Sequence, residues 1–88
     1  MTLIVFIVSI VDNFIMDKEF LRKVASNIKF LRNEKKLTQE ELACDAGVSR
    51  STIGMLESLK TDITLSKIKQ IANALEIEPY ELLKFDKN

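Results

Sequence analysis

Apolar residues recur with a helical period along most of the chain from residue 17 onward. The first such face, predicted for a helix that runs to about Lys35, consists of Phe20, Val24, Ile28 and Leu31. Lysine and arginine side chains occupy the other faces of this segment. A solvated helix surface with cations near its C-terminus explains most of these charges without any ligand.

Start and stop signals divide the next stretch into two short helices. Thr38 and Glu41 form the spacing of a capping box, so a helix is expected to begin at Gln39 and to end near Gly47, which permits a sharp turn. Ser49 then caps another helix. Two short helices joined by a tight turn predict helix-turn-helix geometry.

Two further helices follow by the same kind of signals. Thr64 is the expected cap of a helix whose apolar face consists of Leu65, Ile68, Ile71, Ala72 and Leu75. Pro79 suits the first position of a last helix, because its missing N–H would have no partner there. The pattern therefore predicts an all-α domain of five helices over residues 16–88.

The chain opens with the apolar stretch "MTLIVFIVSIV", which forms a separate extension over residues 1–15. It is shorter than the roughly 20 apolar residues of a membrane span and lacks a basic start and cleavage site, so neither a membrane nor a secretory segment is expected. Its β-branched residues favour a strand that pairs with the same strand of a second subunit. The alternative is upstream sequence that is rarely translated, because Met16 precedes a normal domain start.

Composition excludes several classes of function. The 88 residues are enough for one modest core, and the absence of histidine together with a single cysteine, Cys44, predicts no disulfide, no metal site and a cytoplasmic setting. With only two glycines there is no phosphate-binding loop, so we expect no enzyme, no cofactor and no small-molecule ligand.

Charge is balanced overall but not along the chain. The 13 basic and 13 acidic residues cancel, yet residues 18–60 carry nine Lys/Arg against six Asp/Glu. Nucleic-acid-binding proteins usually carry a net positive charge, and this chain carries none. Any such function must therefore rest on the local excess of positive charge.

The segments "LRNEKKLTQEELACDAGVSRSTIGMLESLK", "ITLSKIKQIANALEI" and "YELL" resemble the Xre-type helix-turn-helix family, which includes Cro and the lambdoid phage repressors. The resemblance covers roughly residues 20–85. It implies a compact five-helix domain that binds double-stranded DNA, usually as a homodimer on a palindromic site. Its small stand-alone members include phage repressors, controllers of restriction-modification operons and antitoxins, and the length suits the first two groups.

The same resemblance implies roles for individual residues. The base-reading positions are Arg50, Ser51 and Met55, and the positions near the DNA backbone are Gln39, Thr52, Ser58, Lys60, Lys35 and Lys36. Arg32 and Glu57 occupy positions where some relatives form a partly buried ion pair. Leu59 and Ile63 replace a common glycine and proline, which predicts a differently shaped loop beside Ser58 and Lys60.

The chemistry of these residues fits base reading. The Arg50 guanidinium can bond O6 and N7 of a guanine, Met55 offers an apolar surface to a thymine methyl, and Gly54 permits close approach to the groove. We therefore predict a DNA-binding regulator that dimerises through Tyr80, Leu83 and Phe85. The alternative function is a protein-interaction module with the same fold, such as an antitoxin, which the net neutrality of the chain favours.

Overall fold

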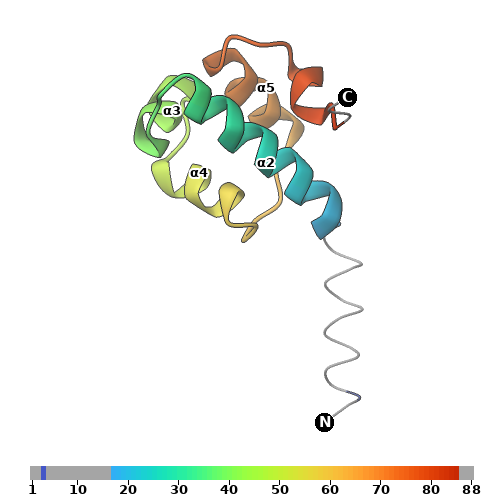
Figure 1. Cartoon of the computed structure of the whole chain (residues 1–88). Helices are drawn as coiled ribbons and strands as arrows, with labels where there is room; N and C mark the ends of the chain where they lie inside the picture. Colours follow the sequence, from blue (N-terminus) through green and yellow to red (C-terminus); the bar gives the residue numbers. More distant parts are fainter. Residues whose placement is uncertain (1–2, 4–16, 86–88) are drawn as a thin grey trace.

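The computed structural model describes residue 3 and residues 17–85 (Figure 1). In that part of the chain the elements are α2 (Lys18–Glu34), α3 (Gln39–Ala46), α4 (Arg50–Glu57), α5 (Leu65–Ala74) and the 3₁₀-helix η1 (Pro79–Leu83). The described residues contain no strand, which confirms the all-α fold class. Leu3 is helical, so the strand predicted within residues 1–15 finds no support at that residue. The rest of the segment falls outside the described residues, where the strand stays a prediction.

Each α-helix begins at a side chain that satisfies a backbone N–H. Asp17, Thr38, Ser49 and Thr64 accept hydrogen bonds from the backbone three residues further on, and Glu41 completes the capping box with Thr38. Such caps satisfy donors that have no partner within the helix. The starts of α3, α4 and α5 are therefore where the sequence pattern predicted them.

Each of the helices α2 to α5 is followed by a residue with left-handed backbone. Gly47 has a φ of 73° after α3, and Lys36, Leu59 and Glu76 have φ values of 58°, 63° and 61° after the other helices. In each case the next N–H bonds back to a carbonyl five residues earlier, as Lys60 does to Met55 at 2.8 Å. Only Gly47 adopts this conformation without steric strain, because it has no Cβ.

The core forms where α2, α3, α4 and α5 meet. Its largest fully buried side chains are Val24, Ile28, Leu42, Ile53, Leu56, Ile71, Leu75 and Leu82. α3 packs against both α4 and α5, and α4 also contacts α2. Every helix thus contributes to one continuous apolar interior, which holds α4 at a defined angle to α3.

Two predicted core positions were wrong. Leu65 is 83% exposed because it is the first residue of α5 and projects where no described element covers it. Phe20 is 49% exposed, and Leu21 is buried in its place. The buried face of α2 runs through Leu21, Val24 and Ile28, and the Phe20 ring instead packs edge-on against Phe85.

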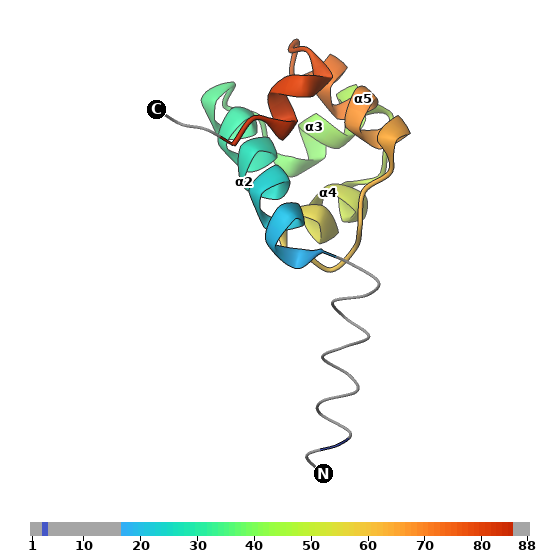
Figure 2. The same ribbon diagram turned by 90° about the vertical axis from the view of Figure 1, so that its right-hand side faces the viewer.

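The last predicted α-helix is a short 3₁₀-helix, which corrects the five-helix prediction. η1 packs against α2 and α5 (Figure 2), and Leu82 is its core residue. The buried side chain of Asn27 donates from Nδ2 to the carbonyl oxygens of Leu82 and Lys84, at 2.9 and 3.1 Å. These bonds fasten the end of η1 to α2.

The described residues contain neither a membrane-crossing helix nor a metal-binding cluster. None of their helices is both long and apolar enough to span a bilayer. No group of three or more His, Cys, Asp and Glu side chains among them is placed to hold a metal ion.

Candidate nucleic-acid interface

The turn between α3 and α4 sets the direction in which α4 projects from the domain. Gly47 supplies the positive φ, and the Val48 N–H bonds back to the Ala43 carbonyl at 3.0 Å. Ala43 is almost completely buried, so its small side chain lets α4 pack closely against α3. The α3–turn–α4 unit is therefore a rigid helix-turn-helix.

The two sides of α4 differ sharply in exposure. Ile53 and Leu56 are fully buried, and the opposite side presents Arg50, Ser51 and Met55 to solvent. Among the described residues Arg50 forms no ion pair. The three predicted base-reading residues thus lie together on the exposed side of one helix.

Three hydroxyl groups cluster at the start of α4. The Ser49 Oγ lies 3.1 Å from Ser51 Oγ and 2.8 Å from Thr52 Oγ1, and it accepts a bond from the Thr52 N–H. Hydroxyl groups can donate to anionic oxygens, and a helix N-terminus favours negative charge. Ser49 was expected only to cap the helix, but its position next to Thr52 places it in the same surface region.

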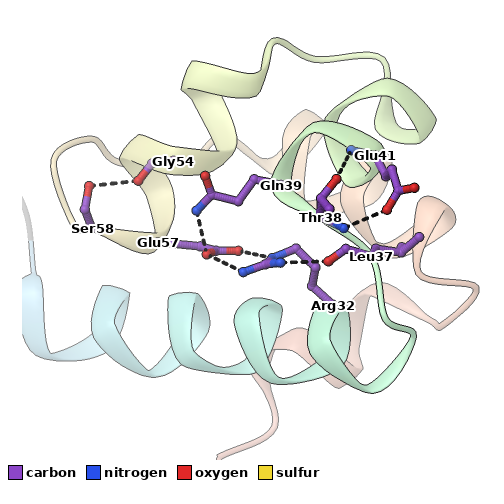
Figure 3. Close-up of polar contacts among 8 residues, drawn as sticks. All are labelled: Arg32, Leu37, Thr38, Gln39, Glu41, Gly54, Glu57 and Ser58. Carbon is purple, nitrogen blue, oxygen red and sulfur yellow. Dashed lines mark hydrogen bonds and ion pairs between the residues drawn. The ribbon is translucent and has the colours of Figure 1, made fainter.

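Gly54 lies opposite Gln39, which begins α3. A Cβ built on Gly54 would be 3.5 Å from the Gln39 Oε1, which is an ordinary contact distance. The fold therefore has room for a methyl group at this position (Figure 3). Neither packing within the chain nor a left-handed backbone requires glycine at this position of α4.

A nearly buried polar network lies beneath α4. Arg32 pairs with Glu57 through two bonds, Nε to Oε2 at 2.7 Å and Nη2 to Oε1 at 3.1 Å (Figure 3). Their side chains are only 11% and 5% exposed. Arg32 also donates to the Leu37 carbonyl at 2.7 Å, and Gln39 Nε2 donates to Glu57 Oε1 at 3.0 Å. This network joins α2, the following turn, α3 and α4.

The network was only partly foreseen from the sequence. The structure brings Arg32 and Glu57 together, as the resemblance implied, and Gln39 bonds to Glu57 of α4, where the resemblance implied a residue that braces the recognition helix. The bond from Arg32 to the Leu37 carbonyl was not foreseen. Asn27 was also missed. Its position, three residues after Val24 and four before Leu31 on an apolar face, is the signal that could have identified a buried polar residue.

The residues expected near the DNA backbone are dispersed. Ser58 donates its hydroxyl to the Gly54 carbonyl at 2.8 Å, and Lys60 is exposed just beyond α4. Lys35 and Lys36 follow α2, where the Lys35 Nζ lies 3.2 Å from a carboxylate oxygen of Glu76 after α5. Lys35 is thus engaged with another part of the domain, and the Ser58 hydroxyl is occupied within its own helix end.

The three residues expected at a dimer interface differ in how far their side chains are exposed to a partner. Tyr80 and Leu83 on η1 are exposed. Phe85 is partly covered, because its ring packs against Phe20 with centroids 5.2 Å apart and lies 5.5 Å from the Lys23 Nζ. Tyr80 and Leu83 therefore remain as exposed apolar groups at the C-terminal end of the domain.

Comparisons with known proteins agree on one family. A family model described as helix-turn-helix matches residues 28–82. A hypothetical transcription factor of Neisseria meningitidis is 38% identical over 68 residues, which are 76% of this chain and 64% of that protein. The control protein C.SmaI of Serratia marcescens is 37% identical over 60 residues, 68% of this chain and 71% of that protein.

A solved structure supports the same relationship. The restriction-modification controller protein C.AhdI of Aeromonas hydrophila superposes with a TM-score of 0.69 at 40% identity, over 70% of this chain and 94% of that one. The chain thus spans nearly the whole of C.AhdI but less than two thirds of the Neisseria protein.

Proposed function

Because the chain belongs to the Xre-type helix-turn-helix family, we infer that it is a sequence-specific DNA-binding transcriptional regulator. The observation that carries this inference is the exposed side of α4, where Arg50, Ser51 and Met55 lie on a helix fixed from below by the Arg32–Glu57 pair. A helix of this kind, with a short polar residue and one long cation on its surface, is suited to the major groove.

Base reading is assigned to the exposed residues of α4. Arg50 donates its guanidinium hydrogens to O6 and N7 of a guanine, and Met55 contacts a thymine methyl. The Ser51 hydroxyl can donate or accept a hydrogen bond, so it can pair with either an acceptor or a donor on a base edge. Gly54 lets the helix axis approach the bases closely. A methyl group would fit at this position within the fold, so packing does not require a glycine there.

General affinity comes from groups around α4. Gln39 begins α3, Thr52 lies in the first turn of α4 and Lys60 follows its end, and we assign these residues to the sugar-phosphate backbone together with Lys35 and Lys36. Ser58 joins them only if its hydroxyl hydrogen leaves the Gly54 carbonyl. Phosphate contacts position the protein without reading sequence. A few such contacts explain how a chain with no net charge can bind DNA.

We assign the dimer surface to the exposed apolar groups of η1, with Tyr80 and Leu83 at its centre and Phe85 at its edge. An isologous contact there would give a two-fold dimer that matches a palindromic operator. Leu83→Asp should produce monomers and weaken operator binding, as measured by sedimentation and by duplex titration. An unchanged sedimentation mass would remove η1 from the interface.

The proposed regulator acts in the cytoplasm, performs no catalysis and needs no cofactor. The family consists of DNA-binding regulators, and the chain lacks histidine. DNA and a second copy of the chain are its proposed partners.

Selection of bound duplexes from a random pool tests the function directly. We expect a palindromic consensus whose half-sites lie about one helical turn apart, and an affinity that falls steeply with salt. Recovery of unselected sequences with a flat salt dependence would refute DNA recognition. That outcome would favour the alternative function, a protein-interaction module such as an antitoxin or co-regulator.

A further inference from the structure

An apolar groove of about 360 Å³ lies between the start of α2, the loop before α5 and the end of η1. Its apolar lining includes Phe20, Leu21, Ile63, Leu65, Ile68 and Leu83. Three of these side chains are substantially exposed: Leu65 by 83%, Phe20 by 49% and Leu83 by 41%. Such a concentration of exposed apolar groups marks an interaction site rather than ordinary surface.

The charges at the groove restrict what it can bind. Its two charged lining residues, Asp17 and Asp62, are both acidic. Carboxylates repel phosphate groups, so neither a nucleic-acid backbone nor an anionic lipid headgroup is a suitable ligand. An apolar segment without acidic side chains is the chemistry that fits.

The chain itself contains a segment with this chemistry. Residues 1–11 carry no charged side chain, and residues 12–16 connect them to Asp17, which lines the groove. Five connecting residues span at most roughly 17 Å. Within a single chain, however, Leu3 is 68% exposed, so its side chain is largely uncovered there.

We propose that the groove binds the apolar segment of residues 2–11 from a second copy of the chain. Leu83 belongs both to the groove and to the proposed dimer surface on η1, which places the groove beside the partner. Reciprocal exchange covers the segment and the groove of both subunits at once, as in a domain swap. The proposal rests on the proposed dimer but not on DNA binding.

Leu65 offers a substitution that tests the groove without unfolding the domain. It is the first residue of α5 and is exposed, and an acidic side chain is favourable in the first turn of a helix. Leu65→Asp should raise the dimer dissociation constant by about tenfold or more, because it places a charge against the apolar segment. Ser66→Asp, the next residue, adds the same charge outside the groove and should leave the constant unchanged.

A substitution within residues 2–11 of the full-length chain, combined with Leu65→Asp, completes a double-mutant cycle. Ile7→Ser should also weaken the dimer, and the Leu65→Asp/Ile7→Ser double variant should be weakened by clearly less than the sum of the two single effects, because both remove one contact and serine adds no charge. Additive effects, or no effect of Leu65→Asp on sedimentation equilibrium, would overturn the proposal. Dimerisation through η1 would stand in that case.

Cross-linking between distinguishable chains decides whether the segment binds its own groove or that of the partner. In a Cys44→Ser background, a tagged chain with Ile7→Cys is mixed with an untagged chain with Leu65→Cys and oxidised. We expect a covalent heterodimer that does not form with Ser66→Cys. Failure of this cross-link, or a disulfide only within a single chain that carries both cysteines, refutes exchange. No DNA is present, so the result is independent of operator recognition.

Discussion

The inner side of α4 packs against the rest of the domain, whereas its outer side is exposed to solvent. On the inner side Ile53 and Leu56 are fully buried, and Glu57 is held by Arg32 and Gln39. On the outer side Arg50 and Met55 are exposed, and Gly54 occupies a helix interior where glycine is unfavourable. One helix of eight residues thus combines a side determined by packing with a side that packing does not determine.

Because of this difference, substitutions on the inner side should change the free energy of unfolding, and substitutions on the outer side should change the affinity for DNA. The described residues contain no buried side-chain polar atom without a partner, so truncating an apolar side chain of the inner side leaves a cavity and removing one member of its ion pair leaves an unpaired group. The outer side is free of such constraints, and its composition therefore reflects what the helix contacts outside the domain. Substitutions on the two sides should affect different measurements.

The largest effect is expected for Glu57→Ala on the inner side. It leaves the Arg32 guanidinium nearly buried with only the Leu37 carbonyl as partner. Removal of one member of a buried pair costs about 3 to 5 kcal/mol in the free energy of unfolding. Thermal unfolding should show a fall in Tm of at least about 12 °C for a domain of this size.

Two controls show whether the loss arises from the unpaired charge. Replacing both partners, Arg32→Met with Glu57→Met, should recover much of the stability, because no buried charge remains. Arg22→Ala removes an exposed pair with Glu19 and should change the unfolding free energy by no more than about 0.5 kcal/mol. If the double variant is as unstable as the single one, the burial of charge is not the cause.

The next largest effect concerns Arg50 on the outer side. Arg50→Ala should lower affinity for the cognate operator by roughly 1 to 3 kcal/mol and relax the preference at one base pair in each half-site. Because Arg50 is exposed, the unfolding free energy should not change. Titrations of cognate and unrelated duplexes distinguish the roles, since a uniform loss for all sequences would make Arg50 a phosphate contact.

Gly54→Ala should change stability and binding in opposite directions. The fold has room for the methyl group, and alanine in a helix interior is more favourable than glycine by about 1 kcal/mol. Thermal unfolding should therefore show a higher Tm, and duplex titration a lower affinity. Gly47→Ala is the matched control and should lower Tm, because its φ of 73° strains any residue with a Cβ. Affinity that rises with Tm would exclude a close approach at Gly54.

The smallest effects are expected for the lysines around α4. Lys60→Gln should flatten the salt dependence of binding by up to about one unit for specific and unrelated duplexes alike. Lys35→Gln should have a smaller effect, because a Glu76 carboxylate already lies 3.2 Å from its ammonium group. Lys69→Gln on α5 is the control, because Lys69 is not among the lysines assigned to the DNA backbone. Equal slopes for all three variants would argue against a phosphate contact by Lys60.

Local signals in the sequence determined the helix starts, the turn and most of the core. Thr38, Ser49 and Thr64 cap their helices because the bonds involved span only three residues. Gly47 ends α3 because the required φ is a property of a single residue. These features depend on neighbours along the chain, so a linear pattern is sufficient to find them.

Only the tertiary structure decided which apolar groups remain exposed and how the polar groups are paired. Periodicity identifies an apolar face but not whether another element covers it, and for that reason Leu65 and Phe20 were misplaced. The bonds from Asn27 to η1 and from Gln39 to Glu57 join residues 55 and 18 positions apart. Such contacts form only when the helices pack together, because their geometry depends on the relative placement of whole elements rather than on local conformation.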